Sequence, residues 1–252
     1  MLSKATQKWI RSLELKKVRQ ASGCFLAEGH KLVGDLLFKL PCRLLAGTDA
    51  WFDRQTNLPE TECHRIDESL LQRLSLLRNP QEVLAVFEIP KDTLQPDALT
   101  NQLTLALDGI QDPGNLGTII RIADWFGIEH IVCSNDTVDA FNPKTVQASM
   151  GAIGRVRLSY LDLPAFLANT PLPIFGTFLD GSNLYDQALP QAALVVMGNE
   201  GNGISPEIER LVQHKILIPD YPMGTTTAES LNVSVATAIV CAEFRRRLTT
   251  SV

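Results

Sequence analysis

Short apolar runs alternate with longer amphipathic segments along most of this 252-residue chain. In the second half, the runs have the length of buried strands, and apolar residues between them recur every three or four positions, as on one face of a helix. Near-continuous apolar strands separated by helices are typical of a parallel α/β sheet covered on both faces. The predicted strands are residues 103–107, 130–133, 173–178, 194–197 and 215–218, and the predicted helices are 116–126, 143–152, 163–169, 206–212 and 231–248.

The first part of the chain shows the same alternation on a smaller scale. Ser3 is a predicted N-cap for a helix whose apolar face includes Trp9, Ile10, Leu13 and Val18. The pattern predicts a small α/β sandwich of roughly 90 residues, near the lower size limit of a stable domain. Its other predicted helices are 30–38 and 68–77, and its predicted strands are 24–27, 42–46, 62–66 and 83–89.

Residues 90–102 interrupt the alternation, with Pro90 and Pro96 and little apolar periodicity. Such a stretch is typical of a linker between domains. We therefore predict an N-terminal domain over residues 1–97 and a C-terminal parallel-sheet domain over residues 98–252.

The net charge of −5 conceals an asymmetry between these parts. Residues 1–91 carry 14 Lys and Arg against 11 Asp and Glu, whereas residues 92–252 carry 9 against 17. A basic segment on an acidic body favours an anionic partner, with phosphate the obvious candidate; a solvated helix face is the alternative. The basic residues that open the chain are Lys4, Lys8, Arg11, Lys16, Lys17 and Arg19, against Glu14 alone.

Composition excludes several classes of protein. Hydrophobic residues at 45% and charged residues at 20% are ordinary for a globular chain and exclude intrinsic disorder. No apolar run approaches the ~20 residues of a membrane helix, and the N-terminal segment lacks the apolar core of a secretory signal. The five cysteines and four histidines are scattered, without CxxC or zinc spacing. We therefore expect a cytoplasmic protein with no metal and no membrane contact.

Three polar, glycine-containing segments follow predicted strands, where ligands of open parallel sheets bind. In the first, residues 105–128, Asn115 suits the N-cap of the following helix, and Arg121 lies about a turn and a half along it. A capped helix with a surface arginine and a helix that delivers an arginine to an anion both fit this pattern. The glycines here do not form GxGxxG, so a dinucleotide site ranks low.

The second segment, residues 193–211, places three glycines within six residues, which exposes backbone groups to a close ligand. Glu200 lies between two of these glycines, where a simple turn does not require it; a solvated loop tip is the alternative. Ser205 and Pro206 are a clear helix start, with serine as the cap and proline at the first helical position.

The third segment, residues 215–247, leads from a strand through a polar loop into a helix. Ser230 and Asn232 are each ordinary N-caps. Three arginines, 245–247, lie at the helix end, where they complement the helix dipole or contact phosphate. The small residues Ser234, Ala238 and Ala242 recur every four positions and allow close helix packing, within the chain or across a dimer.

Taken together and in this order, the three segments resemble the motifs of the SpoU (TrmH-type) RNA ribose 2′-O-methyltransferases of the SPOUT superfamily. The matching pieces are DGIQDPGNLGTIIRIA at 108–123, VVMGNEGNGIS at 195–205, and ILIP…ESLNVSVATAI at 216–239. KKVRQASGCFLAEGHKLVGDLL, nearer the N-terminus, resembles the small RNA-binding domain of this family, which is akin to a ribosomal-protein fold. The resemblance implies a C-terminal deep trefoil knot, S-adenosylmethionine as cofactor, ribosomal or transfer RNA as substrate, and a homodimer.

The resemblance also implies roles for matching residues. Arg121 is expected to clamp an RNA phosphate and not to act as a base, because a guanidinium stays protonated. The link between Pro219 and Ser230 is longer than is usual in the family. The implied cofactor residues are Gly198, Asn199, Gly203, Ile218, Leu231 and Thr177, and the implied catalytic residues are Asn115, Arg121, Glu200, Ser230 and Asn232.

Two other functions stay open on the sequence alone. One is a non-catalytic RNA-binding protein that kept the fold, which a cofactor titration distinguishes. The other is a SPOUT enzyme that methylates a base and not a ribose.

Overall fold

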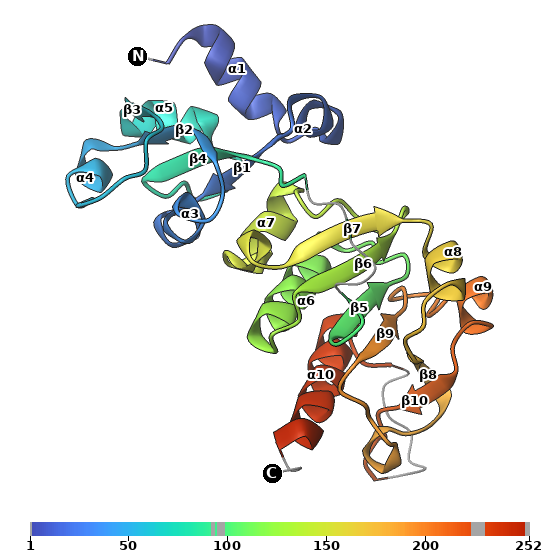
Figure 1. Cartoon of the computed structure of the whole chain (residues 1–252). Coiled ribbons are helices and arrows are strands. Elements are labelled where there is room, and N and C mark those ends of the chain that lie inside the picture. The colour runs from blue at the N-terminus through green and yellow to red at the C-terminus, as the bar shows by residue number, and fades with distance from the viewer. Residues whose placement is uncertain (1, 92–93, 95–98, 223–229, 250–252) are drawn as a thin grey trace. The chain divides into compact units, whose positions relative to one another are not determined.

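The computed structural model describes residues 2–91, 94, 99–222 and 230–249, which form two compact units (Figure 1). Unit 1 comprises Met1–Lys91 and Asp139–Arg155, and unit 2 comprises Asp92–Val138 and Val156–Val252. The predicted domain boundary, between residues 97 and 98, lies outside the described residues.

Unit 1 is built on a four-stranded mixed sheet in the order β1-β4-β2-β3. Strand β4 runs antiparallel to β1 and β2, and β2 pairs in parallel with β3. The strands are β1 Cys24–Glu28, β2 Cys42–Gly47, β3 Glu62–Arg65 and β4 Val83–Glu88; the helices are α1 Lys4–Ser12, α2 Lys16–Ser22, α3 His30–Leu37, α4 Asp49–Phe52, α5 Glu68–Leu74 and α7 Pro143–Ser149, with the 3-10 helix η2 Ala152–Gly154.

The predicted N-terminal helix is broken into α1 and α2. Ser3 caps α1 as expected, because its hydroxyl accepts a hydrogen bond from the Thr6 amide. The helix then ends at Leu13, and Nη1 of Arg19 donates to the carbonyl oxygens of Leu13 (2.8 Å) and Glu14 (2.7 Å). A helix end leaves such carbonyls unsatisfied. Arg19 is 1% exposed, and its guanidinium satisfies the carbonyl groups between α1 and α2. It therefore does not belong to the exposed basic segment that the sequence suggested.

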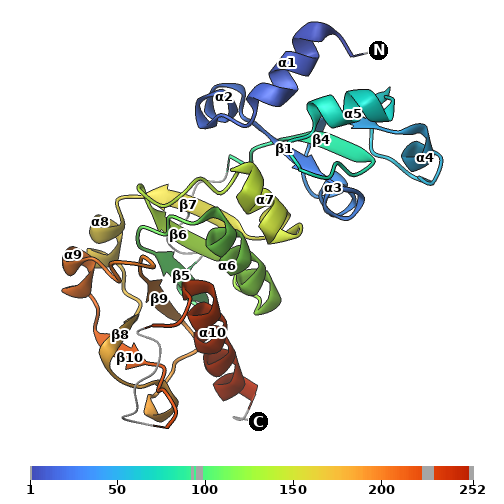
Figure 2. The same cartoon turned by 180° about the vertical axis from the view of Figure 1, so that it is seen from behind.

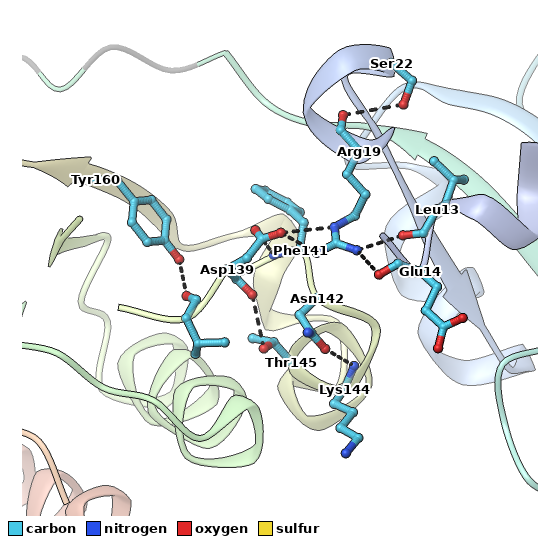
Figure 3. Close-up of polar contacts among 11 residues, drawn as sticks. Leu13, Glu14, Arg19, Ser22, Asp139, Phe141, Asn142, Lys144, Thr145 and Tyr160 are labelled. Carbon is cyan, nitrogen blue, oxygen red and sulfur yellow. Dashed lines mark hydrogen bonds and ion pairs between the residues drawn. The ribbon is translucent and has the colours of Figure 1, made fainter. Parts of the chain in front are cut away.

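Residues 139–155 fold with unit 1, although the sequence pattern assigned them to the second domain. Asp139 Oδ2 accepts hydrogen bonds from Arg19 Nε (3.0 Å) and Nη2 (2.5 Å), as Figure 3 shows. The ring of Phe141 packs on Phe25 of β1, with ring centroids 4.9 Å apart. Two separate segments of the chain therefore form unit 1, and helix α7 of the second segment packs against strand β1 of the first.

Unit 2 contains a six-stranded sheet in the order β10-β8-β9-β5-β6-β7, in which every neighbouring pair is parallel. This confirms the predicted parallel α/β fold. The strands are β5 Leu103–Leu107, β6 His130–Ser134, β7 Arg157–Leu161, β8 Ile174–Asn183, β9 Ala193–Met197 and β10 His214–Leu217; the helices are α6 Pro113–Trp125, α8 Leu163–Ala168, α9 Pro206–Glu209 and α10 Val233–Thr249, with the 3-10 helix η3 Leu184–Asp186.

Helices cover both faces of this sheet. Helices α6 and α10 pack side by side on one face (Figure 2). On the other, Leu163 of α8 and Ile208 of α9 share a core with Val132 and Val196 of the central strands. Strand β7 was missed in the sequence because none of its residues is fully buried, and it thus lacks a continuous apolar run.

The arginines at the end of α10 bind protein groups. Arg245 donates from Nε to the carbonyl of Phe126 (2.7 Å) and from Nη2 to that of Gly127 (3.0 Å), at the end of α6. The buried carboxylate of Glu243 accepts hydrogen bonds from Arg246 Nε (2.7 Å) and Arg247 Nε (2.8 Å). Because these bonds favour the charged form, the pKa of Glu243 falls to about 2.

Glu243→Gln is therefore expected to reduce the free energy of unfolding at pH 7 by about 1.5–3 kcal/mol, since hydrogen bonds to a charged group are lost. The folded pKa is depressed, so this contribution is present above the unfolded value of 4.5 and is lost as pH falls toward about 2. Urea unfolding should show that the difference in free energy of unfolding between the variant and the wild type becomes smaller from pH 7 to pH 3. Glu207→Gln, at an exposed glutamate of α9, is the matched control, and a gap independent of pH would contradict the prediction.

Candidate functional site

A pocket of about 410 Å³ opens at the carboxyl ends of β8, β9 and β10. Residues 177–179, 197–204 and 216–218 line it, together with the residues that lead into α10 and the first turn of that helix. All six residues expected to bind a cofactor lie in this lining, and so do two of the expected catalytic residues, Glu200 and Ser230. The volume is in the range of small-molecule sites, about 300–1,000 Å³.

The loop after β9 is closed by its own backbone. The amide of Asn199 donates to the carbonyl of Gly203, and the amide of Gly203 donates to the carbonyl of Asn199, both at 2.9 Å. Gly203 has φ of +69°, which favours glycine. A Cβ on Gly198 would lie 2.3 Å from the carbonyl carbon of Gly203, so any side chain there would open the loop. The glycines therefore bring the backbone to the wall of the pocket.

The side chain of Asn199 braces this loop and joins it to the first motif. Its Oδ1 accepts hydrogen bonds from the amides of Gly201 (2.9 Å) and Asn202 (3.0 Å), and its Nδ2 donates to the carbonyl of Gly109 (2.6 Å). The loop after β9, which lines the pocket, is thus joined by a hydrogen bond to the first motif after β5.

A bulge in β8 forms the opposite wall. The parallel pairing with β10 passes from Gly176 opposite Lys215 directly to Ser182 opposite Ile216. Residues 177–181 therefore leave the ladder, and Thr177, which we expected at a strand end, lies within the longer strand β8 at the start of this bulge. The bulge brings 177–179 into the pocket lining.

Asn115 is not the N-cap of α6. Asp112 is the cap, because its Oδ1 accepts from the amide of Asn115 at 2.8 Å. The side chain of Asn115 is therefore available for other bonds. It donates from Nδ2 to Oε1 of Glu200 (2.9 Å) and accepts at Oδ1 from Nδ2 of Asn232 (2.9 Å).

The hydrogen bonds of this polar cluster have a defined direction. Asn232 caps α10 as predicted: its Oδ1 accepts from the amide (3.0 Å) and the hydroxyl (2.6 Å) of Ser234. Its amide group must therefore turn Nδ2 toward Asn115 Oδ1, which in turn directs Nδ2 of Asn115 at Glu200. The cluster thus holds Glu200, at the rim of the pocket, as a hydrogen-bond acceptor.

Arg121 is not part of this cluster. It is exposed on α6, outside the pocket lining, and within the described residues its side chain has no hydrogen bond or ion pair. The structure therefore brings together Asn115, Glu200 and Asn232 beside the pocket and leaves Arg121 facing solvent.

Comparison with known proteins identifies the family. Residues 102–242 match the model of the SpoU rRNA Methylase family, and residues 5–85 match that of the MRM3-like substrate binding domain. The chain belongs to the SpoU rRNA methylase family. It is 32% identical to 23S rRNA (guanosine(2553)-2′-O)-methyltransferase RlmP of Bacillus subtilis, over 93% of this chain and 94% of that protein.

Solved structures of SpoU relatives have the same fold. A putative RNA methyltransferase of the TrmH family from Porphyromonas gingivalis is 42% identical, with a TM-score of 0.89 over 98% of this chain and 99% of that one. An AdoMet-bound rRNA methyltransferase from Sinorhizobium meliloti is 29% identical, with a TM-score of 0.85 over 98% and 97%. The trefoil knot of the SpoU fold depends on the path through residues 223–229, which lie outside the described residues, so the knot stays a prediction.

Several residues of this candidate site were missed by the sequence analysis. Asp108, directly after β5, accepts a hydrogen bond from the amide of Ser205 (2.7 Å) and ties the first motif to the start of α9. Phe178, Leu217 and Ala236 add apolar surface to the pocket. The acidic residue at a strand end was a signal for Asp108, whereas apolar lining residues look like core residues in the sequence.

Within the described part of the chain, no three His, Cys, Asp or Glu side chains gather as metal ligands would. The helices described there are all too short or too polar to cross a membrane.

Proposed function

We propose that this protein transfers a methyl group from S-adenosylmethionine to a ribose 2′-hydroxyl of ribosomal RNA. The observation that carries the proposal is that the second and third motifs line one pocket, while the first motif is joined to its rim by the hydrogen bonds of Asn115. Ribosomal RNA is the proposed substrate because RlmP and the Sinorhizobium relative are both named as methyltransferases of ribosomal RNA. An enzyme of ribosomal RNA works where ribosomes assemble, so the proposed location is the cytoplasm.

The pocket fits the cofactor in size and in chemistry. Ile204, Leu217 and Leu231 offer apolar surface for an adenine ring, and the glycine loop lets the backbone approach closely. The residues proposed to hold the cofactor are Thr177, Gly198, Asn199, Gly203, Ile218 and Leu231. When bound, the cofactor supplies an electrophilic methyl group.

The polar residues are proposed to bind and orient the RNA. Arg121 clamps a phosphate next to the target ribose, and its positive charge favours ionisation of the 2′-hydroxyl. Glu200, held by Asn115, accepts hydrogen bonds at the rim of the pocket, and Ser230 lines the same pocket. On transfer, the 2′-oxygen would bond to the methyl carbon as the methyl–sulfur bond breaks and the sulfur keeps that electron pair. The proton of the 2′-hydroxyl would leave to a phosphate oxygen or to water.

We also propose a homodimer in which Arg121 of one subunit completes the site of the other. The support is that Arg121 lies outside the pocket lining of its own chain. Val235 is 48% exposed and Trp125 is 84% exposed, on the adjacent helices α10 and α6. Of the small residues that recur every four positions in α10, Ala242 is exposed and available for a dimer contact. Ser234 is not, because it is buried and hydrogen-bonded to Asn232.

Filling the pocket is expected to abolish cofactor binding. Ala236→Phe places a ring in the lining of the pocket and should weaken S-adenosylmethionine binding by at least about tenfold in calorimetry. Ala168→Phe, at an exposed alanine of α8 outside the pocket, is the matched control and should bind as the wild type does. Failure of the wild type to bind at millimolar cofactor would refute the enzyme and leave an RNA-binding protein. Mass spectrometry of nuclease-digested product RNA distinguishes ribose from base methylation.

A further inference from the structure

Unit 1 contains a second pocket of about 340 Å³, far from the three motifs in the sequence. Its walls are strand β1, the residues that follow α5, and helix α7. Leu26, Leu76 and Leu77 provide apolar surface, and Glu28, Lys144 and Gln147 provide polar groups.

Glu28 is the unusual member of this lining, because it is a carboxyl group that is only 5% exposed. It accepts hydrogen bonds from the Leu76 amide (2.8 Å) and from the Ser75 hydroxyl. A carboxylate offers about four acceptor positions, so further donors can bind there. Burial raises the pKa of Glu28, although its hydrogen bonds and the charge of Arg11 oppose the rise, and no ion pair with Glu28 is seen among the described residues. Each oxygen already accepts one hydrogen bond, and a ligand with hydrogen-bond donors would use the remaining acceptor positions.

The α7 wall is held firmly in place. The buried ion pair of Arg19 and Asp139 anchors the chain just before the helix, and Asn142 Oδ1 accepts from the Lys144 amide at 2.9 Å (Figure 3). The side chain of Lys144 extends away from this cluster in Figure 3 and is exposed. Its ammonium group has no hydrogen-bond or ion-pair partner among the described residues. Lys144 is therefore an unpaired positive charge at the edge of the pocket.

The charge of unit 1 favours an anionic ligand. Its segments 1–91 and 139–155 together carry 16 Lys and Arg against 12 Asp and Glu, whereas the rest of the chain carries 7 against 16. Proteins read RNA sequence mostly at unpaired bases, which they hold by apolar or stacking contacts and by hydrogen bonds to the base edge. An apolar pocket with a buried acceptor and a cation at its rim matches one such nucleotide.

We propose that this pocket takes one unpaired nucleotide of the RNA substrate, with the donor edge of the base on Glu28 and its phosphate on Lys144. The inference rests on the proposed function, because that function makes RNA the substrate. Guanine is the base that fits best, since its N1–H and N2–H₂ donors lie side by side and a carboxylate accepts both. The pocket thus gives unit 1 a role in choosing the target sequence.

The first test fills the pocket in the full-length protein. Ala148→Trp adds a ring from α7 and should weaken binding of a labelled single-stranded octaribonucleotide, seven uridines and one guanosine, by at least about tenfold in fluorescence anisotropy. Lys144→Ala should weaken binding and reduce the salt slope by about 0.7. Lys39→Ala, at an exposed lysine of unit 1 outside the pocket, should change both much less.

The second test replaces the guanosine of the probe. Inosine lacks the N2 amino group and adenosine lacks both donors, so affinity should fall from guanosine to inosine to adenosine. Equal affinity for the three RNAs, or wild-type RNA affinity in an Ala148→Trp protein with an unchanged melting temperature, would overturn the proposal. These results leave S-adenosylmethionine binding and methyl transfer by the wild type intact, whereas loss of those two in the wild type would refute the proposed function itself.

Discussion

Arg121→Ala should reduce kcat/KM for RNA methylation by about 10³-fold or more while leaving S-adenosylmethionine affinity and the melting temperature unchanged. The side chain is exposed and outside the pocket, so its removal affects neither packing nor the cofactor. Loss of a charged donor at the reacting group typically costs a factor of about 10²–10³, and loss of RNA positioning adds to it. Methyl incorporation from labelled cofactor and calorimetry measure the two effects separately.

Two further variants make this result specific. Arg121→Lys should also be impaired, because an ammonium group does not reproduce the bidentate guanidinium contact with phosphate. Arg210→Ala, at an exposed arginine of unit 2 outside the pocket, should keep wild-type activity. Full activity in Arg121→Ala would remove this residue from the site.

If two subunits share each site, mixed dimers of two inactive variants should recover activity. Combining Arg121→Ala subunits with Ala236→Phe subunits should restore one complete site in each mixed dimer, since the first supplies the pocket and the second supplies the arginine. Ala236→Phe suits this experiment better than a substitution at Gly198, where a Cβ would strike the loop backbone. Mixed dimers without recovered activity would refute the shared site and leave the methyltransferase assignment standing.

Asp139→Ala should lower the free energy of unfolding by about 3–5 kcal/mol, because it leaves Arg19 as an unpaired buried charge. The side chains of Arg19 and Asp139 are 2% and 16% exposed, and the carbonyls of Leu13 and Glu14 fix the guanidinium in place. The loss should loosen α7 from unit 1, since Asp139 directly precedes that helix. Urea unfolding measures the energy, and amide exchange of residues 139–155 locates it.

A surface pair provides the matched control. Asp53 binds Arg65 at 2.8 Å, but both side chains are more than half exposed, so Asp53→Ala should cost less than about 1 kcal/mol. Arg19→Met combined with Asp139→Ala should be less destabilised than the two single variants added together. Similar losses for Asp139→Ala and Asp53→Ala would show that the buried pair does not hold the segment.

The sequence predicted the local elements well where a single property decides them. Continuous apolar runs marked β5, β6 and β9, in which every residue is buried, since strands buried on both faces are apolar along their length. Strands β8 and β10 were also predicted from apolar runs, although they are only partly buried. Strand β7 was missed because none of its five residues is fully buried, so it has no continuous apolar run. Ser3, Ser205 and Asn232 were correctly predicted as N-caps. The cap of α6 was predicted wrongly: it is Asp112 and not Asn115, and both Asp and Asn are residue types that favour an N-cap.

The sequence by itself therefore determined the parallel α/β class of unit 2, the family, and the glycine loop that lines the pocket, because apolar runs and glycine spacing are local patterns. The order of the strands in the sheet came only from the structure. Only the tertiary structure decided which partners the polar groups have. The bonds of Asn115 to Glu200 and Asn232, and the pairing of Arg19 with Asp139, join residues 85 to 120 positions apart. Contacts at such separations arise from packing of the whole chain. They gave Arg19, which the sequence placed in a basic segment, a buried structural role, and they joined Asn115, which is not the N-cap, to Glu200 and Asn232.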